Sequence, residues 1–187
     1  MREVLGIMIA KGASTRLEAK NRRLFHGRPM FLWNLEKLLR ELPEVVFESD
    51  DASLLALAAE AGAIPMLRPE SLRGNEVPSV PLFQNIVRQR PRRPDAVLNV
   101  QANSPTTTPK TIRAAVHVMQ HTACNELQTV FPVTHTQNGS LWGFGIDRLV
   151  NYGDPYVHHP DVLLVDDAID IHTSEEFERA LVQRPLV

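Results

Sequence analysis

The chain has 187 residues, of which 43% are hydrophobic and 22% are charged. This balance is typical of a globular protein, and the length predicts a single domain over residues 1–187. A formal net charge of -2 argues against broad electrostatic binding to nucleic acid or to an anionic membrane. No apolar run reaches the length of a membrane span, and the single cysteine, Cys124, excludes an internal disulfide. We therefore expect a cytoplasmic protein.

In the first half of the chain, apolar runs of strand length alternate with helical patterns. The pattern predicts strands at 4–10, 45–48, 64–67 and 95–101, and helices at 29–39, 52–61 and 78–89. Pro29 suits the first turn of its helix, and Gly62 is expected to end the next one.

The second half continues in the same way. After a turn-rich loop at 102–109, Thr108 is expected to cap a helix that begins at Pro109 and ends near His121. Further strands are predicted at 127–133, 141–146 and 162–165. The acidic sequence TSEE at 173–176 suits the start of a last helix.

This alternation predicts an α/β fold, a three-layer α/β/α domain with a mostly parallel, Rossmann-like sheet. Ligands of such sheets bind beyond the carboxyl ends of the strands. Four segments follow predicted strands and are therefore candidate site segments, namely 11–21, 49–51, 101–105 and 166–172.

The loop after the first strand carries the strongest chemical signal. Gly12 permits a sharp turn, and the small side chains of Ala13 and Ser14 leave backbone N–H groups open to an anion. The same loop holds three cations, Lys11, Arg16 and Lys20. Amide donors with positive charge suit a triphosphate. The alternative interpretation is an ordinary strand-to-helix turn with solvated basic side chains, since neither a P-loop nor a G-x-G-x-x-G motif is present.

Short motifs in a fixed order support the first interpretation. They are ASTRL (13–17), KN (20–21), GRPM (27–30), ESDD (48–51), AAEAGA (58–63), LRPESL (67–72), PS (78–79), QANSP (101–105), NGS (138–140) and AIDIHTSEEF (168–177). Together they resemble the sugar-acid cytidylyltransferases, which comprise the CMP-sialic acid (CMP-nonulosonate) synthetases and the CMP-Kdo synthetases. The resemblance covers nearly the whole chain and implies their nucleotidyltransferase fold, which is of the glycosyltransferase-A type.

The resemblance also implies roles for individual residues. The triphosphate would be held by the first loop, at Lys11, Gly12, Ala13, Ser14 and Arg16. Lys20 would neutralise charge at the α-phosphate, and Asn21 would contact the nucleotide. Cytidine recognition falls on Arg68 and Ser79. The acceptor would face Gln101, Asn103 and Ser104. Asp170 would bind the divalent metal, Mg²⁺ or Mn²⁺.

Three departures from the family pattern matter. The family's Asp-x-Asp is here Asp170-Ile171-His172, and His is a poor ligand for Mg²⁺, so Asp166 or Asp167 is the expected source of a second carboxylate. Asn103 stands where the Kdo-type loop has Asp, which argues against a second metal there. The stretch between 105 and 138 is short, which suggests a smaller acceptor, a different dimer or a monomer. Because such cytidylyltransferases are often dimers, a homodimer stays among the expected partners.

The resulting hypothesis is an enzyme that transfers CMP from CTP to a small acidic acceptor and releases pyrophosphate. The acceptor is a nonulosonic or Kdo-type sugar acid, or a phosphonate. Two alternatives stay open: a nucleotidyltransferase that uses GTP or UTP, and a non-catalytic module that binds a nucleotide or a sugar. The pair His158–His159 lies in a Pro- and Asp-rich segment, and we interpret it as a surface loop rather than a metal site.

Overall fold

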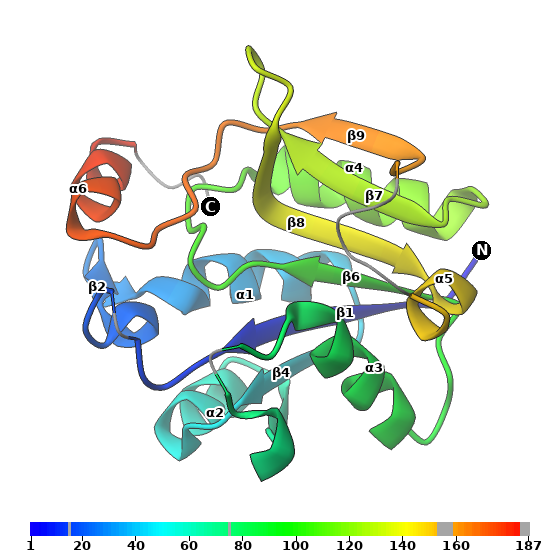
Figure 1. Ribbon diagram of the computed structural model, residues 1–187, viewed down its shortest axis with the longest axis horizontal. Coiled ribbons are helices and arrows are strands. Elements are labelled where there is room, and N and C mark those ends of the chain that lie inside the picture. The colour runs from blue at the N-terminus through cyan, green and yellow to red at the C-terminus, as the bar shows by residue number, and fades with distance from the viewer. Residues whose placement is uncertain (15, 75, 153–158, 184–187) are drawn as a thin grey trace.

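The computed structural model describes residues 1–14, 16–74, 76–152 and 159–183. One seven-stranded sheet forms the centre, in the order β5-β4-β1-β6-β8-β7-β9 (Figure 1). Its strands are β1 (Val4–Ala10), β4 (Val45–Ser49), β5 (Ile64–Leu67), β6 (Ala96–Val100), β7 (Glu126–Val130), β8 (Gln137–Gly145) and β9 (Val162–Val165). A separate small sheet pairs β2 (Leu24–Phe25) with β3 (Arg28–Pro29).

Strand direction confirms the prediction of a mostly parallel sheet. β1 pairs in parallel with β4 and β6, β4 with β5, and β7 with β9. β8 runs antiparallel to both of its neighbours, β6 and β7. The antiparallel direction has a simple cause, because residues 131–136 between β7 and β8 are too few for the crossover that a parallel pair needs.

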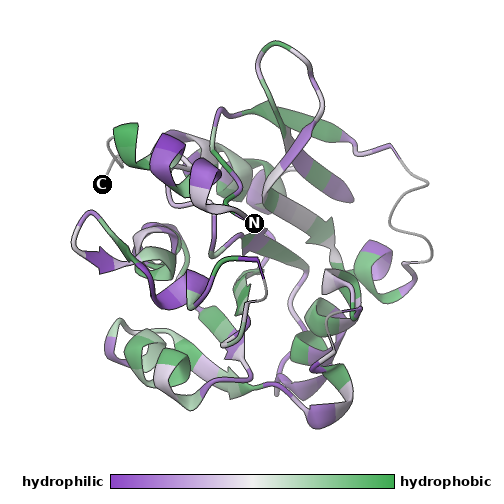
Figure 2. Ribbon diagram, turned by 60° about the vertical axis from the view of Figure 1, so that its left-hand side comes forward, coloured by the Kyte–Doolittle hydropathy of each residue, from purple (hydrophilic) through white to green (hydrophobic). Residues whose placement is uncertain are grey.

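Helices cover both faces of the sheet, as the three-layer prediction requires. One core cluster joins the strands to α1 (Met30–Glu41), α2 (Ala52–Glu60) and α4 (Pro109–His121). A second cluster joins the other face to α3 (Ser79–Gln89) and α5 (Ile146–Val150). Figure 2 shows the mostly hydrophobic strands enclosed between helices of mixed hydropathy.

The last helix, α6 (Ser174–Val182), packs away from the main sheet. Its Phe177 and Ala180 join Phe25 of β2, Leu17 and Ile171 in a third buried cluster. Figure 1 shows α6, in red, on the same side of the molecule as β2, in blue. This cluster holds the segment after β9 beside the loop after β1.

Most element boundaries agree with the pattern analysis. The Thr108 hydroxyl accepts the Thr111 N–H at the start of α4. Thr173 and Glu176 form a reciprocal capping box at the start of α6. The predicted limits around β7 and β8 are wrong, because residues 131–136 form a hairpin turn that the apolar pattern did not reveal.

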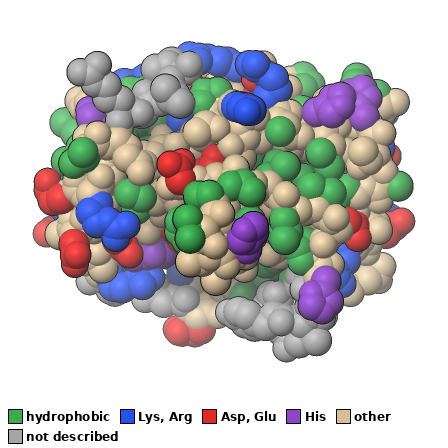
Figure 3. Space-filling view, turned by 90° about the horizontal axis from the view of Figure 1, so that it is seen from above, with side chains coloured by type: hydrophobic (Ala, Val, Ile, Leu, Met, Phe, Trp, Pro, Cys, Tyr) green, Lys and Arg blue, Asp and Glu red, His purple; other side chains and the backbone are tan. Residues whose placement is uncertain are grey.

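β9 is an edge strand that leaves hydrophobic side chains in solvent. Leu163 is 51% exposed and Val165 is 57% exposed, and Figure 3, viewed from above, shows hydrophobic side chains on this side. None of the helices in the described residues combines the length and apolar character that crossing a bilayer requires. His158 lies outside the described residues, so the interpretation of the His158–His159 pair is not tested.

Candidate active site

A cavity of about 400 Å³ opens where β1 and β6 end, and most of the predicted site residues line it. They are Lys11, Ala13, Ser14, Arg16, Lys20, Asn21, Arg68, Ser79, Gln101, Asn103 and Asp170. Residues from distant parts of the chain meet here because the carboxyl ends of parallel strands share one edge of the sheet.

Two predicted site residues, Gly12 and Ser104, do not line this cavity. The Gly12 N–H donates to Asp50 Oδ1 over 2.8 Å, and a Cβ on Gly12 would lie 2.5 Å from Asp51 Oδ2. Gly12 therefore permits the close approach of Asp51, the N-cap of α2, and its amide already has a partner. Ser104 has no solvent exposure and lies behind Asp170, with Oγ 3.5 Å from Asp170 Oδ1.

The lysines of the first loop differ in their surroundings. Lys11 Nζ donates to the Gly74 carbonyl over 2.9 Å and so joins the first loop to the segment before α3. The Lys20 side chain makes no hydrogen bond or ion pair within the described part of the chain. Burial lowers the pKa of Lys20, and the nearby Asp170 carboxylate partly offsets this shift. Lys20 therefore presents an available cationic donor to the cavity.

Arg68 lies in the cavity wall with a side-chain exposure of only 1%. Its guanidinium pairs with Glu48 over 2.8 Å and donates to the Ala10 carbonyl over 3.2 Å. Burial raises the pKa of Glu48, although the hydrogen bond from Arg68 opposes that shift. Arg68 Nη1 is buried and has no hydrogen-bond partner among the described residues. Such a donor is a group that a ligand can satisfy.

Two side chains of helix α1 donate hydrogen bonds to the loop at 101–107. Asn34 Nδ2 donates to the carbonyls of Gln101 (3.0 Å) and Ser104 (2.6 Å). Lys37 Nζ donates to the carbonyls of Pro105 and Thr107, each over 2.8 Å. Burial lowers the pKa of Lys37 to about 8. The amphipathic pattern of α1 did not reveal these contacts, because a polar residue in a helix reads as solvent-facing until its neighbours are known.

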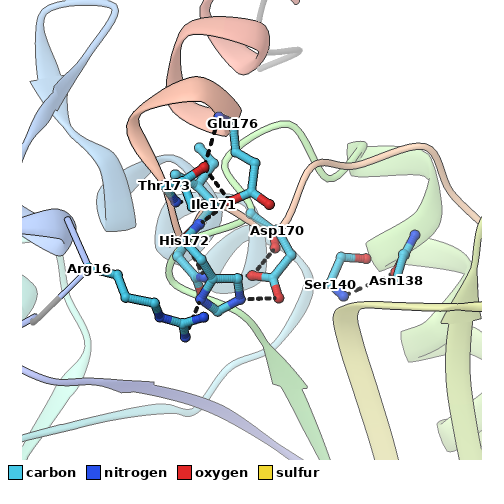
Figure 4. A network of polar contacts seen from close by, with 10 residues as sticks. Arg16, Asn138, Ser140, Asp170, Ile171, His172, Thr173 and Glu176 are labelled. Carbon is cyan, nitrogen blue, oxygen red and sulfur yellow. Dashed lines mark hydrogen bonds and ion pairs between the residues drawn. The ribbon is translucent and has the colours of Figure 1, made fainter.

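Asp170, His172 and Arg16 form a chain of contacts at the other side of the cavity (Figure 4). Asp170 Oδ1 accepts from Asn103 Nδ2 over 2.5 Å, and Oδ2 lies 2.8 Å from His172 Nε2. His172 Nδ1 lies 3.0 Å from Arg16 Nη2. Asn103 therefore positions Asp170, and His172 joins the first loop to the segment after β9.

Asp170 is the single acidic side chain among the described residues that line the cavity. The described part of the chain holds no group of three or more His, Cys, Asp or Glu side chains arranged to bind a metal. Asp166 does not supply the missing carboxylate, because it is buried and accepts from Thr111 Oγ1 and the Ala168 N–H. These residues fit a divalent ion that takes most of its ligands from phosphate and water, as Mg²⁺ commonly does.

A second cavity of about 280 Å³ adjoins the first and shares Gln101 and Asp170 with it. Its other walls come from the start of β8, including Gly139 and Trp142. Gly139 has a positive φ of 73°, and a Cβ there would lie 3.4 Å from Asp170 Oδ2. The apolar sequence around Trp142 predicts a core residue. Trp142 does pack against the second core cluster, and it lines this cavity as well.

Comparison with known proteins supports the resemblance to cytidylyltransferases. The cytidylyltransferase family matches residues 5–140. The CMP-N,N'-diacetyllegionaminic acid synthase of Legionella pneumophila is 28% identical over 158 residues, which cover 81% of this chain and 66% of that protein. A pseudaminic acid cytidylyltransferase of Campylobacter jejuni is 33% identical over 86 residues, or 44% of this chain and 37% of that protein. The chain thus spans less than two thirds of the length of these relatives.

Solved structures share the fold at low sequence identity. A CMP:2-keto-3-deoxy-manno-octonic acid synthetase complexed with CTP has a TM-score of 0.74 and 13% identity, covering 96% of this chain and 97% of that one. A Mycobacterium tuberculosis protein in complex with manganese has a TM-score of 0.72 and 16% identity, covering 97% of this chain and 100% of that one. The predicted fold class is therefore confirmed. Because the family match extends over most of its length, this chain belongs to the cytidylyltransferase family.

Proposed function

We propose that the chain is a CTP-dependent cytidylyltransferase. It transfers CMP from CTP to a small acidic acceptor, a nonulosonic or Kdo-type sugar acid or a phosphonate, and releases pyrophosphate. One observation carries this proposal: the cations Lys11, Arg16 and Lys20 line one cavity, and a second cavity meets it at Gln101 and Asp170. The first offers a place for the triphosphate, and the second a place for the acceptor.

The reaction is an in-line displacement at the α-phosphorus. An acceptor oxyanion forms the new bond to phosphorus, and the bond to the bridging oxygen breaks, so that its electron pair leaves with pyrophosphate. The protein contributes position and charge rather than covalent chemistry. Lys20 neutralises charge on the α-phosphate, and Lys11 and Arg16 stabilise the leaving pyrophosphate. The open amides of Ala13 and Ser14 add donors to the triphosphate.

Recognition of CTP falls on the opposite wall of the cavity. Arg68 Nη1 and Asn21 Oδ1 are both buried without a partner among the described residues. Asn21 Nδ2 donates to the Lys11 carbonyl, so its buried oxygen is the atom that is left without a described partner. Ser79 begins α3 beside them. These groups offer donors and acceptors to the cytidine, and a base that leaves them unpaired is disfavoured.

The acceptor and the metal meet at Asp170. Gln101 contacts the acceptor directly, and Asn103 and Ser104 act through their contacts with Asp170. Asp170 holds a divalent ion, Mg²⁺ or Mn²⁺, which when bound neutralises phosphate charge. The partners of the chain are thus CTP and the acceptor, and neither nucleic acid nor a membrane. A homodimer and a cytoplasmic location stay predictions.

Pyrophosphate release tests the proposal. The protein is mixed with each of the four nucleoside triphosphates, Mg²⁺ or Mn²⁺, and acceptors that span nonulosonic acids, Kdo and small phosphonates. We expect release with CTP and one class of acceptor. Lys20→Ala should lower kcat about a hundredfold or more. It should leave stability unchanged, because the Lys20 side chain makes no hydrogen bond or ion pair with the described residues.

The matched control is Lys110→Ala, which removes an exposed lysine from α4. It should leave the rate unchanged. Release with GTP or UTP in place of CTP would replace the cytidylyl assignment with another nucleotidyl transfer. CTP binding without release, for every acceptor, would favour the non-catalytic binding module.

A further inference from the structure

The His172 imidazole contacts two charged side chains, Arg16 and Asp170. Arg16 Nη2 lies 3.0 Å from Nδ1, and a guanidinium can only donate, so Nδ1 is the acceptor. Asp170 Oδ2 lies 2.8 Å from Nε2, and an ionised carboxylate can only accept, so Nε2 carries the proton. Both ring nitrogens of His172 are therefore engaged (Figure 4).

The spacing of Asp170 Oδ2 and His172 Nε2 also suits two ligands of one metal ion. Adjacent ligand atoms at ~2.0–2.1 Å from an octahedral ion lie about 2.9 Å from each other, close to the 2.8 Å between these atoms. The side chains of Asp170 and His172 are 29% and 32% exposed, so an ion can reach them. Both residues line the cavity proposed for CTP, whose phosphates would complete the coordination.

We propose that His172 determines which metal this site takes. Asp170 and His172 form a carboxylate–imidazole pair, and this pair prefers a first-row transition-metal dication to Mg²⁺. The reason is ligand chemistry, because Mg²⁺ favours an all-oxygen shell whereas an imidazole nitrogen suits transition metals. The inference rests on the proposed function in one respect, since it takes the remaining ligands from the bound triphosphate and water.

Arg16 couples this metal site to the nucleotide. Arg16 Nη2 lies 3.0 Å from His172 Nδ1, so the guanidinium holds the imidazole against Asp170 before the nucleotide binds. A bound triphosphate attracts the exposed Arg16 guanidinium away from His172. The ion replaces the hydrogen bond between Asp170 and His172, and it binds with the nucleotide rather than before it.

The test uses the full chain with CTP and no acceptor, and Mn²⁺ is the probe. Electron spin echo modulation of bound Mn²⁺ detects coupling to an imidazole nitrogen, and we expect this coupling only when CTP is present. Calorimetry then gives the ratio of CTP affinity with Mn²⁺ to that with Mg²⁺. His172→Asp, which supplies a second carboxylate, should abolish the coupling and lower this ratio about tenfold.

Two further variants make the result specific. His172→Gln keeps a polar side chain without an imidazole, and it should also lose the nitrogen coupling. His117→Asp is the matched control on α4, where the His117 and His121 rings lie 4.6 Å apart and form an exposed pair that Mn²⁺ could bind. It should keep the CTP-dependent coupling and the affinity ratio of the wild type.

Three results would overturn the proposal: no nitrogen coupling in the wild type with CTP, coupling that persists in both His172 variants, or an affinity ratio that His172→Asp leaves unchanged. Because no acceptor is present, the outcome does not depend on turnover. Failure of pyrophosphate release with nitrogen coupling intact would refute the reaction alone. Pyrophosphate release by the wild type, together with a Mn²⁺-to-Mg²⁺ ratio of CTP affinity that His172→Asp leaves unchanged, would refute the metal preference alone.

Discussion

The pair of Arg68 and Glu48 is the most deeply buried charge pair of the cavity wall, with side-chain exposures of 1% and 0%. Such a pair adds little stability relative to an apolar pair, because both ions lose their hydration. It does hold the guanidinium of this cavity-lining residue in one orientation, and Nη1 has no hydrogen-bond partner among the described residues. The arrangement therefore positions a donor for a ligand rather than stabilising the empty protein.

Glu48→Gln tests this view. The change leaves the buried Arg68 guanidinium with only neutral partners, the new amide and the Ala10 carbonyl. Breaking such a pair by removing one charge typically costs about 3–5 kcal/mol. We expect the free energy of unfolding, measured in urea, to fall by about 3 kcal/mol, and the affinity for CTP to fall with it. The control is Asp147→Asn, which breaks the exposed Arg93–Asp147 pair and should leave both quantities unchanged. Equal effects of the two changes would contradict a special role for burial.

At the residue scale, the sequence located the site better than it described individual contacts. Lys20 and Arg68 could be placed in one cavity because motif order and strand ends fix where they lie. The sequence could not show that Gly12 and Ser104 lie outside the cavity lining. The partner of an amide and the burial of a hydroxyl depend on packing between distant segments. The contact of His172 with Arg16 was hidden for the same reason, since the two residues are far apart in sequence.

At the scale of elements, the start of α6 matters most for the site. The Thr173 hydroxyl accepts the Glu176 N–H, and Glu176 Oε2 accepts the N–H groups of Thr173 and His172. The hydrogen bonds from these N–H groups outweigh the effect of burial and lower the pKa of Glu176. The capping box thus fixes the backbone of His172 as well as the helix.

Thr173→Ala removes half of this capping box. Loss of an N-cap hydroxyl typically costs about 1 kcal/mol, and we expect a decrease of that size in the free energy of unfolding. Backbone amide exchange at 171–176 should accelerate more than exchange in α4, because opening is local. Ser174→Ala, one residue into the helix, is the control and should leave exchange unchanged. Uniform acceleration across both helices would show that α6 does not open on its own.

The elements that the sequence predicted well have regular hydrophobic patterns and clear terminal signals. β1 and α4 have clear apolar periods and recognisable ends, so their bounds followed from the pattern. α5 has only 5 residues, too few for a helical period. The antiparallel direction of β8 depends on the turn after β7, whose His135 adopts a positive φ of 54° that its residue type does not announce.

At the scale of the whole molecule, Lys37 links the layer of α1 to the edge of the sheet that carries the candidate site. It projects from α1 into the interior and donates to two carbonyls of the 101–107 loop. Its charge is costly there, and burial lowers its pKa from 10.5 to about 8, with Asp166 opposing the shift and Arg40 adding to it. The loop that carries Gln101 and Asn103 is therefore held by a cation that the fold disfavours.

This shift makes the stability of the protein depend on pH in a definite direction. Between pH 8 and 10.5 the unfolded state keeps the Lys37 proton while the folded state releases it, so the free energy of unfolding rises with pH. The unfavourable contribution is fully present below pH 8 and is relieved as pH rises through this window. Relative to Lys37→Met, the wild type should therefore gain about 2 kcal/mol in free energy of unfolding between pH 7 and pH 10.

Urea unfolding of the wild type and of Lys37→Met at pH 7 and pH 10 gives the difference in their free energies of unfolding. The contributions of titrating groups that both proteins share cancel in this difference. Lys110→Met controls for the loss of one lysine from an exposed position on α4, and its difference from the wild type should stay constant. A constant difference for Lys37→Met would mean that the Lys37 ammonium is better solvated than its contacts indicate. A difference that changes in the opposite sense would mean that hydrogen bonds to Pro105 and Thr107 outweigh burial, because those bonds favour the charged form.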